Sequence, residues 1–358
     1  MHSPADAIKL DGSGGAGGGQ VLRTALSLSA LTCKPFEISN IRASRPKPGL
    51  QAQHLASVRA AARLSDAEVV GAELNSVSLK FSPGEISGNN FSFDCGTAGS
   101  TMLIAQTLLP IMAFGNGKKE ARLVGGTENA FAPTSFFFRH SFLPAVSKMG
   151  ADSALEVIRF GWYPKGGGEV RISVESTAGA IRPVDLTERG KLERMRGYAI
   201  VSNLKAEIAQ RMKTRLLKNI SEAAFCANVK VELVDAPAIG EGAEAFLLAN
   251  YGHFHAGFTA LGERGKPSEK VAGEAFHNFS QFDKSGACVE QHLSDQLLLY
   301  CALAKGRSVL QVERITPHLL TNAGVVSQFL PDAQIAIEGM ENEAGAVTVE
   351  GIGFESGN

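Results

Sequence analysis

The sequence predicts a mixed α/β fold of the α+β type, in which one βαβαββ unit occurs three times and a smaller α/β segment interrupts the third copy. Two observations lead to this prediction. Apolar strands and helices recur in the same order at intervals of roughly 80 residues, and a segment with its own pattern separates the last copy from its beginning. The 358 residues are enough for two domains.

The first copy is predicted from alternating apolar runs, which indicate strands, and from helical spacing between them. The strands are expected at 6–10, 35–41, 68–73 and 77–82, and the helices at 20–33 and 50–64. The second copy repeats the order, with strands at 91–94, 121–125, 155–160 and 169–174, and helices at 99–114 and 135–149.

The third copy is expected near the end, with a helix at 289–305, a strand at 308–313, a shorter helix from Thr321, and the strands "AQIAIEG" and "AVTVEG". Residues 187–285 carry a different order: a strand, an amphipathic helix with an apolar residue at every fourth position, three strands and a helix after Pro267. We therefore predict a large domain of residues 1–186 and 286–358, and an inserted small α/β domain of residues 187–285.

Composition favours a protein of a reducing compartment. The five cysteines are scattered and form no C-x-x-C pair, and the net charge is −1. No apolar run reaches the length of a membrane span, and "MHSPADAIKL" has no apolar core of a signal peptide. We expect a cytoplasmic protein that does not enter a membrane, or a nuclear one if the source is eukaryotic.

Four glycine-rich turns occupy similar places in the copies: "GSGGAGGGQ", "CGTAGST", "VGGTEN" and "YPKGGGEV". The first two each precede a predicted helix, where backbone N–H groups and the helix dipole favour an anion. Neither is followed by the G-K-[ST] of a Walker motif, and neither is a clean G-x-G-x-x-G. The alternative is that the glycines only allow tight turns or close packing. For the last two turns this alternative is as well supported as anion binding.

A basic segment, "NIRASRPKPGLQAQHL", places Arg42, Arg45 and Lys47 on a proline-stiffened loop, with Gln53 and His54 at the start of the next helix. Arginine matches phosphate oxygens bidentately, and lysine adds a compact charge. Arg23, in the first turns of the helix after the first glycine loop, could join them. A solvated basic surface is the simpler alternative.

Two further segments hold titratable side chains in informative places. "VEQHLSDQLLLYCALAKG" is a predicted helix with Glu290, His292 and Asp295 in its first turns, and "ERITPHLLTNAG" sets His318 on a loop after a strand. A single histidine is more often structural than catalytic. No pair of histidines has metal-ligand spacing with a third partner, and no G-x-S-x-G elbow occurs, so serine-hydrolase chemistry is not expected.

Taken together and in order, the segments "DGSGGAGGGQVLR", "IRASRPKPGLQAQHL", "GTAGS", "GGTENAFAP", "YPKGGGEV", "LTERG", "HLSDQLLLYCALA" and "HLLTN" resemble the RNA 3′-terminal phosphate cyclases. The resemblance spans nearly the whole chain. It implies a large domain of three βαβαββ units and a smaller thioredoxin-like insert, in agreement with the repeat pattern.

The resemblance also implies a mechanism. His318 matches the histidine that attacks the α-phosphorus of ATP and forms a covalent histidine–AMP adduct. AMP then passes to the 3′-terminal phosphate of the RNA, and the 2′-OH closes a 2′,3′-cyclic phosphate. Asp295 matches the acidic residue that orients the histidine. RNA is the implied substrate because DNA lacks the 2′-OH.

Other residues take roles through the same resemblance. Pro133 and His292 match the two sides of the adenine site, where the family often has tyrosine at the second position, and Gln106 matches the reader of the adenine edge. The first loop, with Gly17, Gly18, Gly19 and Gln20, would cradle the ATP phosphates beside Arg23. The cluster expected around the phosphates of RNA and ATP is Arg23, Arg42, Arg45, Lys47, Gln53 and His54.

The sequence departs from the family at one position. The first loop usually reads "EGGGQ", with a glutamate implicated in holding Mg²⁺ or Mn²⁺, and here that residue is Ala16. If the missing carboxylate matters, Ala16→Glu should lower the metal concentration that adenylation needs. The departure keeps open a non-catalytic cyclase-like protein that binds RNA or acts in ribosome assembly. A related repeat enzyme such as an enolpyruvyl transferase is a third reading, and the oligomeric state, a homodimer included, is left open.

Overall fold

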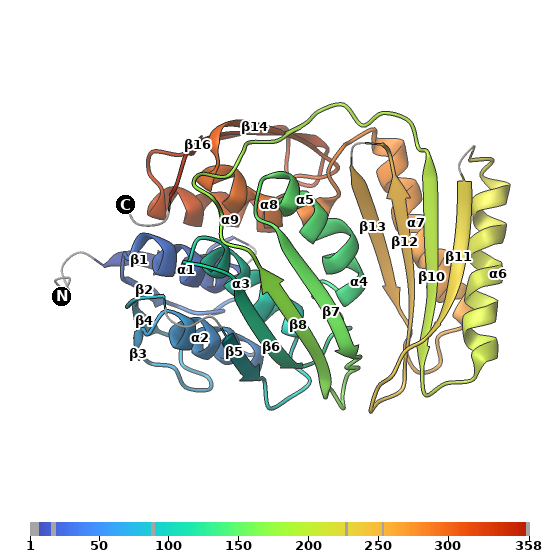
Figure 1. Ribbon diagram of the computed structural model, residues 1–358, viewed down its shortest axis with the longest axis horizontal. Helices are drawn as coiled ribbons and strands as arrows, with labels where there is room; N and C mark the ends of the chain where they lie inside the picture. The colour runs from blue at the N-terminus through green and yellow to red at the C-terminus, as the bar shows by residue number, and fades with distance from the viewer. Residues whose placement is uncertain (1–6, 16–18, 87–89, 226–227, 253, 356–358) are drawn as a thin grey trace.

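The computed structural model describes residues 7–86, except 16–18, and residues 90–355, except 226–227 and 253. Their strands form four sheets of four strands each. In Figure 1 the three sheets of the repeats and their helices fill the left and centre of the molecule, and the insert forms its right-hand part.

The first repeat is built as the sequence predicts. Its strand order is β1-β2-β4-β3, with β1 and β2 parallel and the other pairs antiparallel. Its elements are β1 (Ile8–Asp11), α1 (Gly19–Thr32), β2 (Phe36–Ser39), α2 (Ala52–Leu64), β3 (Glu68–Val70) and β4 (Leu79–Ser82).

The second repeat has the same strand order, β5-β6-β8-β7. Its second helix is divided into an α-helical turn, a π-helical turn and another α-helix. The elements are β5 (Asn90–Asp94), α3 (Thr101–Ala113), β6 (Lys119–Gly125), α4 (Ser135–Phe137), η2 (Phe138–Phe142), α5 (Leu143–Lys148), β7 (Ser153–Arg159) and β8 (Gly168–Val174).

The third repeat again has this order, β9-β14-β16-β15, but its first strand precedes the insert. Its elements are β9 (Asp185–Leu186), α8 (Gln291–Leu303), β14 (Lys305–Val312), α9 (Pro317–Phe329), β15 (Gln334–Glu338) and β16 (Gly345–Ile352). The predicted start of α9 at Thr321 is wrong. The helix begins at Pro317 because Thr316 caps it and proline suits the first helical position.

The insert has a different topology. Its sheet has the order β11-β10-β12-β13, and its two helices lie on the face away from the repeats (Figure 1). The elements are β10 (Arg194–Ser202), α6 (Ala206–Glu222), β11 (Asn228–Asp235), β12 (Gly242–Asn250), β13 (His255–Leu261) and α7 (Ser268–Ser285). The domain boundaries at residues 187 and 285 stay a prediction.

Five helices from three repeats pack at the centre of the large domain. Helix α1 packs against α2, α3 and α9, and α8 packs against α9. Leu22, Ala25 and Leu26 on α1 are fully buried, as are Leu298 and Cys301 on α8. Because α1 is buried over much of its surface, its polar side chains bond to neighbouring helices: Thr24 donates to Asn322 on α9, and the Ser27 hydroxyl donates to the Thr107 carbonyl on α3.

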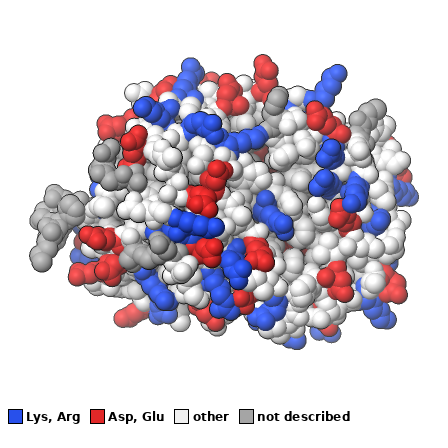
Figure 2. Space-filling model, viewed as in Figure 1, with Lys and Arg blue, Asp and Glu red and all other residues white. Residues whose placement is uncertain are grey.

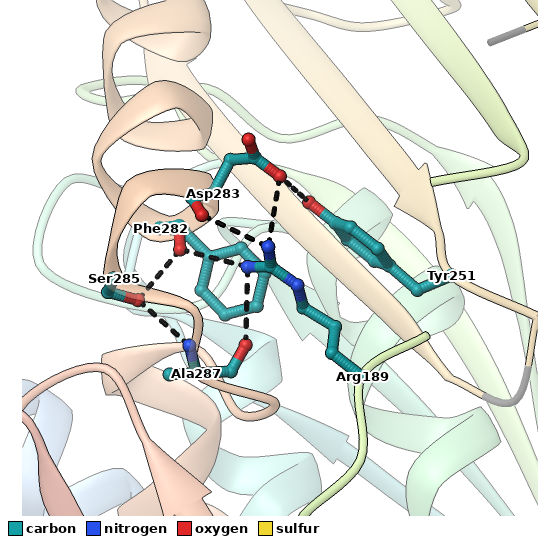
Figure 3. Close-up of polar contacts among 6 residues, drawn as sticks. All are labelled: Arg189, Tyr251, Phe282, Asp283, Ser285 and Ala287. Carbon is teal, nitrogen blue, oxygen red and sulfur yellow. Dashed lines mark hydrogen bonds and ion pairs between the residues drawn. The ribbon is translucent and has the colours of Figure 1, made fainter. Parts of the chain in front are cut away.

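Arg189 links the segment through which the chain enters the insert to the segment through which it leaves (Figure 3). The guanidinium of Arg189 donates to the carbonyls of Phe282 (3.3 Å) and Asp283 (3.0 Å), and it lies 3.4 Å from the Asp283 carboxylate. It also stacks over the Tyr251 ring at 4.7 Å, and the Tyr251 hydroxyl donates to Asp283. Arg189 of the "LTERG" segment therefore holds the chain at the start of the insert against the chain at its end.

Charges are mixed over the face shown in Figure 2, where Lys and Arg lie among Asp and Glu. This agrees with the net charge of −1. No helix of the described residues combines the length and apolarity that crossing a membrane requires.

Candidate active site

The first glycine loop is anchored at its start and approaches α9. The Asp11 carboxylate accepts hydrogen bonds from the Ser13 N–H (2.9 Å), the Ser13 hydroxyl (2.8 Å) and the Asn40 amide (3.2 Å). Gly15 has a φ of +59°, and a Cβ there would overlap the Thr321 hydroxyl. Glycine is therefore required where the loop of the first repeat touches the helix that carries His318.

Gly19, the first residue of α1, is enclosed by two side chains of the predicted phosphate cluster. A Cβ at Gly19 would lie 2.5 Å from an Arg23 guanidinium nitrogen and 2.7 Å from the His54 ring. Arg23 in turn donates to the Gln20 side chain at 2.9 Å. The glycine lets Arg23 and His54 meet over the start of the helix.

His54 is a neutral hydrogen-bond donor. Its Nδ1 accepts from the Gln51 N–H at 3.2 Å, which leaves the proton on Nε2, on the edge of the ring that faces Gly19. Burial, with the charges of Arg23 and Arg42, lowers the pKa of His54 to about 3. The ring can thus donate one hydrogen bond into the site at neutral pH.

His318 lies on the first turn of α9, at the surface. Thr316 caps this helix by accepting from the Leu319 N–H at 3.1 Å. Partial burial and the charges of Arg23, His292 and Arg45 lower the pKa of His318. The imidazole is therefore neutral near pH 7, as a nucleophile must be, and it stands at the end of a helix that favours anions.

Asp295 is 8% exposed on α8, one turn from the N-cap Glu290. Burial raises the pKa of Asp295 to about 7, opposed by the charges of His292 and Arg23. Burial likewise lowers the pKa of Arg23 to about 10, opposed by Asp295, so Arg23 stays charged. In the described part of the chain no hydrogen bond is found between Asp295 and His318. The charges of Arg23 and His292 act on both residues.

A chain of hydrogen bonds joins the three helices beneath these residues. The Thr24 hydroxyl on α1 donates to the Asn322 side-chain oxygen on α9 at 2.6 Å, and the Asn322 amide donates to the Asp295 carbonyl on α8 at 2.7 Å. Asn322 is 2% exposed. Sequence reasoning missed Thr24 and Asn322, although their spacing was a signal: Asn322 follows His318 by four residues, and Thr24 follows Arg23.

A cavity of about 20 Å³, room for one water molecule, lies at this junction. The candidate residues Gln20, Arg23, Gln106 and Asp295 line it, so the structure brings these four together. Three polar atoms at its wall are buried and have no hydrogen-bond partner among the described residues: Arg23 Nε, Gln296 Oε1 and the Tyr300 hydroxyl. The cavity is thus suited to a polar occupant.

In the basic segment, Arg42 is hydrogen-bonded within its own loop, whereas Arg45 and Lys47 are exposed to solvent. Arg42 donates to the carbonyls of Lys47 (2.6 Å) and Gly49 (3.2 Å), so its guanidinium shapes the loop. Arg45 acts electrostatically on His318, and Arg42 on His54, so the segment does lie beside both histidines.

Gln53 faces the second glycine loop. Its amide nitrogen donates to the Ser100 carbonyl at 3.1 Å, and its amide oxygen accepts from the Ser100 N–H. Ser100 is the N-cap of α3. Gln53 therefore holds the start of this helix beside α2, in addition to the phosphate contact predicted for it.

The remaining candidates are Pro133, His292 and residues of the first loop. Pro133 is half-buried in the loop before α4, and the His292 side chain is 70% exposed on α8, 3.8 Å from the Glu290 carboxylate. No contact between the two is found in the described ranges. Gly17, Gly18 and Ala16 lie outside the described residues. No group of three or more His, Cys, Asp or Glu that could hold a metal ion occurs within the described ranges. Ala16, at the position where the family usually has glutamate, has no carboxylate.

Comparison with known proteins identifies the family. The family model of the RNA 3′-terminal phosphate cyclases matches residues 14–337. The chain belongs to this family. Similar cyclases include proteins named RNA 3′-terminal phosphate cyclase from Methylococcus capsulatus (43% identical, over 90% of this chain and 91% of the relative), Pyrobaculum neutrophilum (41%, over 97% and 99%) and Ralstonia nicotianae (42%, over 97% and 98%).

Proposed function

We propose that this chain is an RNA 3′-terminal phosphate cyclase that uses ATP and reacts through a covalent histidine–AMP adduct on His318. The names of its relatives and its family support cyclase activity. The observation that carries the adenylation step is the neutral imidazole of His318 at the start of α9, with the charge of Arg23 beside it.

The proposed reaction has three steps, as the resemblance to the family implies. An imidazole nitrogen of His318 attacks the α-phosphorus of ATP; an N–P bond forms and the bond to pyrophosphate breaks. A 3′-phosphate oxygen of the RNA then attacks the AMP phosphorus, and His318 leaves. Finally the 2′-OH attacks the 3′-phosphorus, loses its proton, and AMP departs.

The chain's own residues would assist by charge and by hydrogen bonds. Arg23 stays protonated, and its guanidinium would neutralise phosphate charge at the start of α1. His54 would donate from Nε2 to a phosphate oxygen, because it is neutral and its Nδ1 is occupied. Asp295 would act on His318 indirectly. Its charge acts on Arg23, and its carbonyl accepts from Asn322, which joins α8 to α9.

The test is incubation with ATP labelled in its α-phosphate, followed by denaturation. We expect label on the wild-type protein, released by acid as a phosphoramidate is, and no label on His318→Ala. His277→Ala is the matched control, because His277 is an exposed histidine on α7. Absence of label on the wild type over a range of Mg²⁺ and Mn²⁺ concentrations would contradict the proposal.

Ala16 favours a second candidate function, a non-catalytic member of the family that binds RNA. The same experiment separates the two. A chain that binds 3′-phosphorylated RNA but is never labelled by ATP would have this second function.

A further inference from the structure

Three loops meet beside the second glycine loop, and glycines allow them to touch. Glu128 and Trp162 form a β-bridge, and the Asn129 amide donates to the Ala98 carbonyl at 2.8 Å. A Cβ at Gly166 would lie 2.7 Å from the Ala98 Cα, and one at Gly167 would lie 2.6 Å from the Ile239 side chain. Gly166 thus lets its loop touch the second glycine loop, and Gly167 lets the same loop touch the insert at Ile239.

Each of these three loops exposes one large apolar side chain. Phe131 is fully exposed, Tyr163 is 78% exposed and Ile239 is 54% exposed. We call these three residues the loop patch. Lys165, which is also exposed, lies between Tyr163 and Ile239 in the sequence. Its Cβ lies 3.4 Å from the position that a Cβ at Gly240 would take. Exposed apolar side chains gathered on interlocked loops indicate a binding surface.

Phe131 is held in an unfavourable backbone conformation. Its φ is +61°, in the left-handed region that bulky residues avoid. A backbone of this kind is strained, and the fully exposed ring gains nothing from packing in the core. A residue that strains the chain only to present a ring to solvent is expected to bind something with that ring.

The loop patch adjoins the candidate active site through a short series of contacts. Ala98, against which Gly166 and Asn129 lie, is two residues before Ser100. Ser100 is bonded at both backbone groups to Gln53, and the neighbouring His54 encloses Gly19 with Arg23. An RNA strand that ends at His54 would therefore run toward the loops that carry the loop patch.

We propose that the loop patch binds single-stranded RNA upstream of its 3′ end, with bases stacked on Phe131 and Tyr163 and a backbone phosphate near Lys165. This rests on the proposed function. Aromatic rings beside a basic side chain suit a single strand of any sequence, since every base has a π face. Ile239 would extend the apolar surface, which gives the insert a part in holding the substrate.

The experiment measures binding of a 3′-phosphorylated RNA of about ten nucleotides, the scale of a single-strand site, and of uridine 3′-phosphate. The variants are Phe131→Asn, which tolerates the left-handed backbone, Tyr163→Ala, and Tyr163→Phe, which keeps the ring. Met340→Ala, at an exposed site of the third repeat, is the control. Self-adenylation with labelled ATP, which requires no RNA, is measured on each.

We expect Phe131→Asn and Tyr163→Ala each to raise the Kd for the longer RNA by about 5- to 100-fold, the range measured for loss of one stacked base. Tyr163→Phe and Met340→Ala should bind the RNA as the wild type does, and uridine 3′-phosphate should bind all variants equally.

Unchanged affinity of both ring-deleting variants for the longer RNA, with self-adenylation intact, would overturn the proposal and leave the proposed function standing. An equal loss of affinity for uridine 3′-phosphate would also overturn it, because the rings would then act at the terminal nucleotide. Failure of the wild type to self-adenylate would instead count against the proposed function.

Discussion

The two helix-opening glycine loops stand at the same place in two copies of one repeat, yet their glycines do different things. In the first loop, Gly15 admits Thr321 of the third repeat, and Gly19 admits Arg23 and His54. In the second loop, Gly99 admits the Gln53 side chain, and Gly126 of the neighbouring "VGGTEN" turn lets its backbone approach the Ala98 carbonyl. One loop collects charged and titratable side chains, and the other is part of a rigid support.

The comparison shows how a repeated unit supplies an asymmetric site. In the third repeat the same connection, from β9 to α8, contains the whole insert. Three equivalent connections therefore provide a candidate phosphate site, a support for it, and a second domain. The variants below test this division.

The largest effect is expected at the first loop. Gly19→Ala forces the Arg23 guanidinium and the His54 ring apart, and a displacement of about 1 Å in a site can lower the rate by about 100-fold. The rate of self-adenylation measures it. Gly14→Ala is the matched control, because the nearest atom to its Cβ is 3.8 Å away; equal loss in both variants would contradict the role given to Gly19.

The hydrogen-bond chain between the helices should come next. Asn322→Ala leaves the Thr24 hydroxyl and the Asp295 carbonyl unpaired, which costs about 2–3 kcal/mol in the free energy of unfolding. Because the change alters the spacing of α1, α8 and α9, kcat should fall more than KM rises. A double-mutant cycle with Thr24→Val checks the pairing, and strictly additive effects would show that the two side chains are not coupled.

The buried charge of Asp295 predicts a dependence of stability on pH. Its pKa is about 7 in the folded protein and near 3.8 when exposed, so the unfolded chain releases this proton first and stability falls as pH rises from about 4 to 7. Asp295→Asn removes the free-energy cost of burying this carboxylate in its charged form. At about pH 8 it should be more stable than the wild type by on the order of 2 kcal/mol, and at about pH 5 by much less.

Thermal unfolding at the two pH values measures this effect. Self-adenylation of Asp295→Asn should be lower than that of the wild type at about pH 8, where Arg23 loses its opposing charge, and close to it at about pH 5, where the wild-type carboxyl is already protonated. Equal gains in stability at both pH values would mean that the carboxyl does not titrate in this range.

The smallest effect is expected at the second loop. Gln53→Ala removes two hydrogen bonds to Ser100 and should lower the free energy of unfolding by about 1–2 kcal/mol. Thermal unfolding without RNA is the measurement. An unchanged stability with weaker RNA binding would show that Gln53 acts on the phosphate alone and not on the loop.

The repeat pattern could be predicted because each element carries its own signal. Apolar periodicity places α1, α2, α3 and α8 within a few residues of their observed bounds. The start of α9 was placed four residues late. The apolar pattern begins inside the first turn, and the capping residue Thr316 with Pro317 was the signal that was available.

The amino-acid sequence alone determined the order of elements, the family, and the residues able to carry charge, because these depend on local pattern and residue type. Only the tertiary structure decided that Gln53 holds Ser100, that Asn322 joins three helices, and that Arg189 clamps the insert. It also decided that burial sets the pKa of Asp295 and His54. Each of these depends on which distant groups become neighbours and how much water they lose, and no local pattern records that.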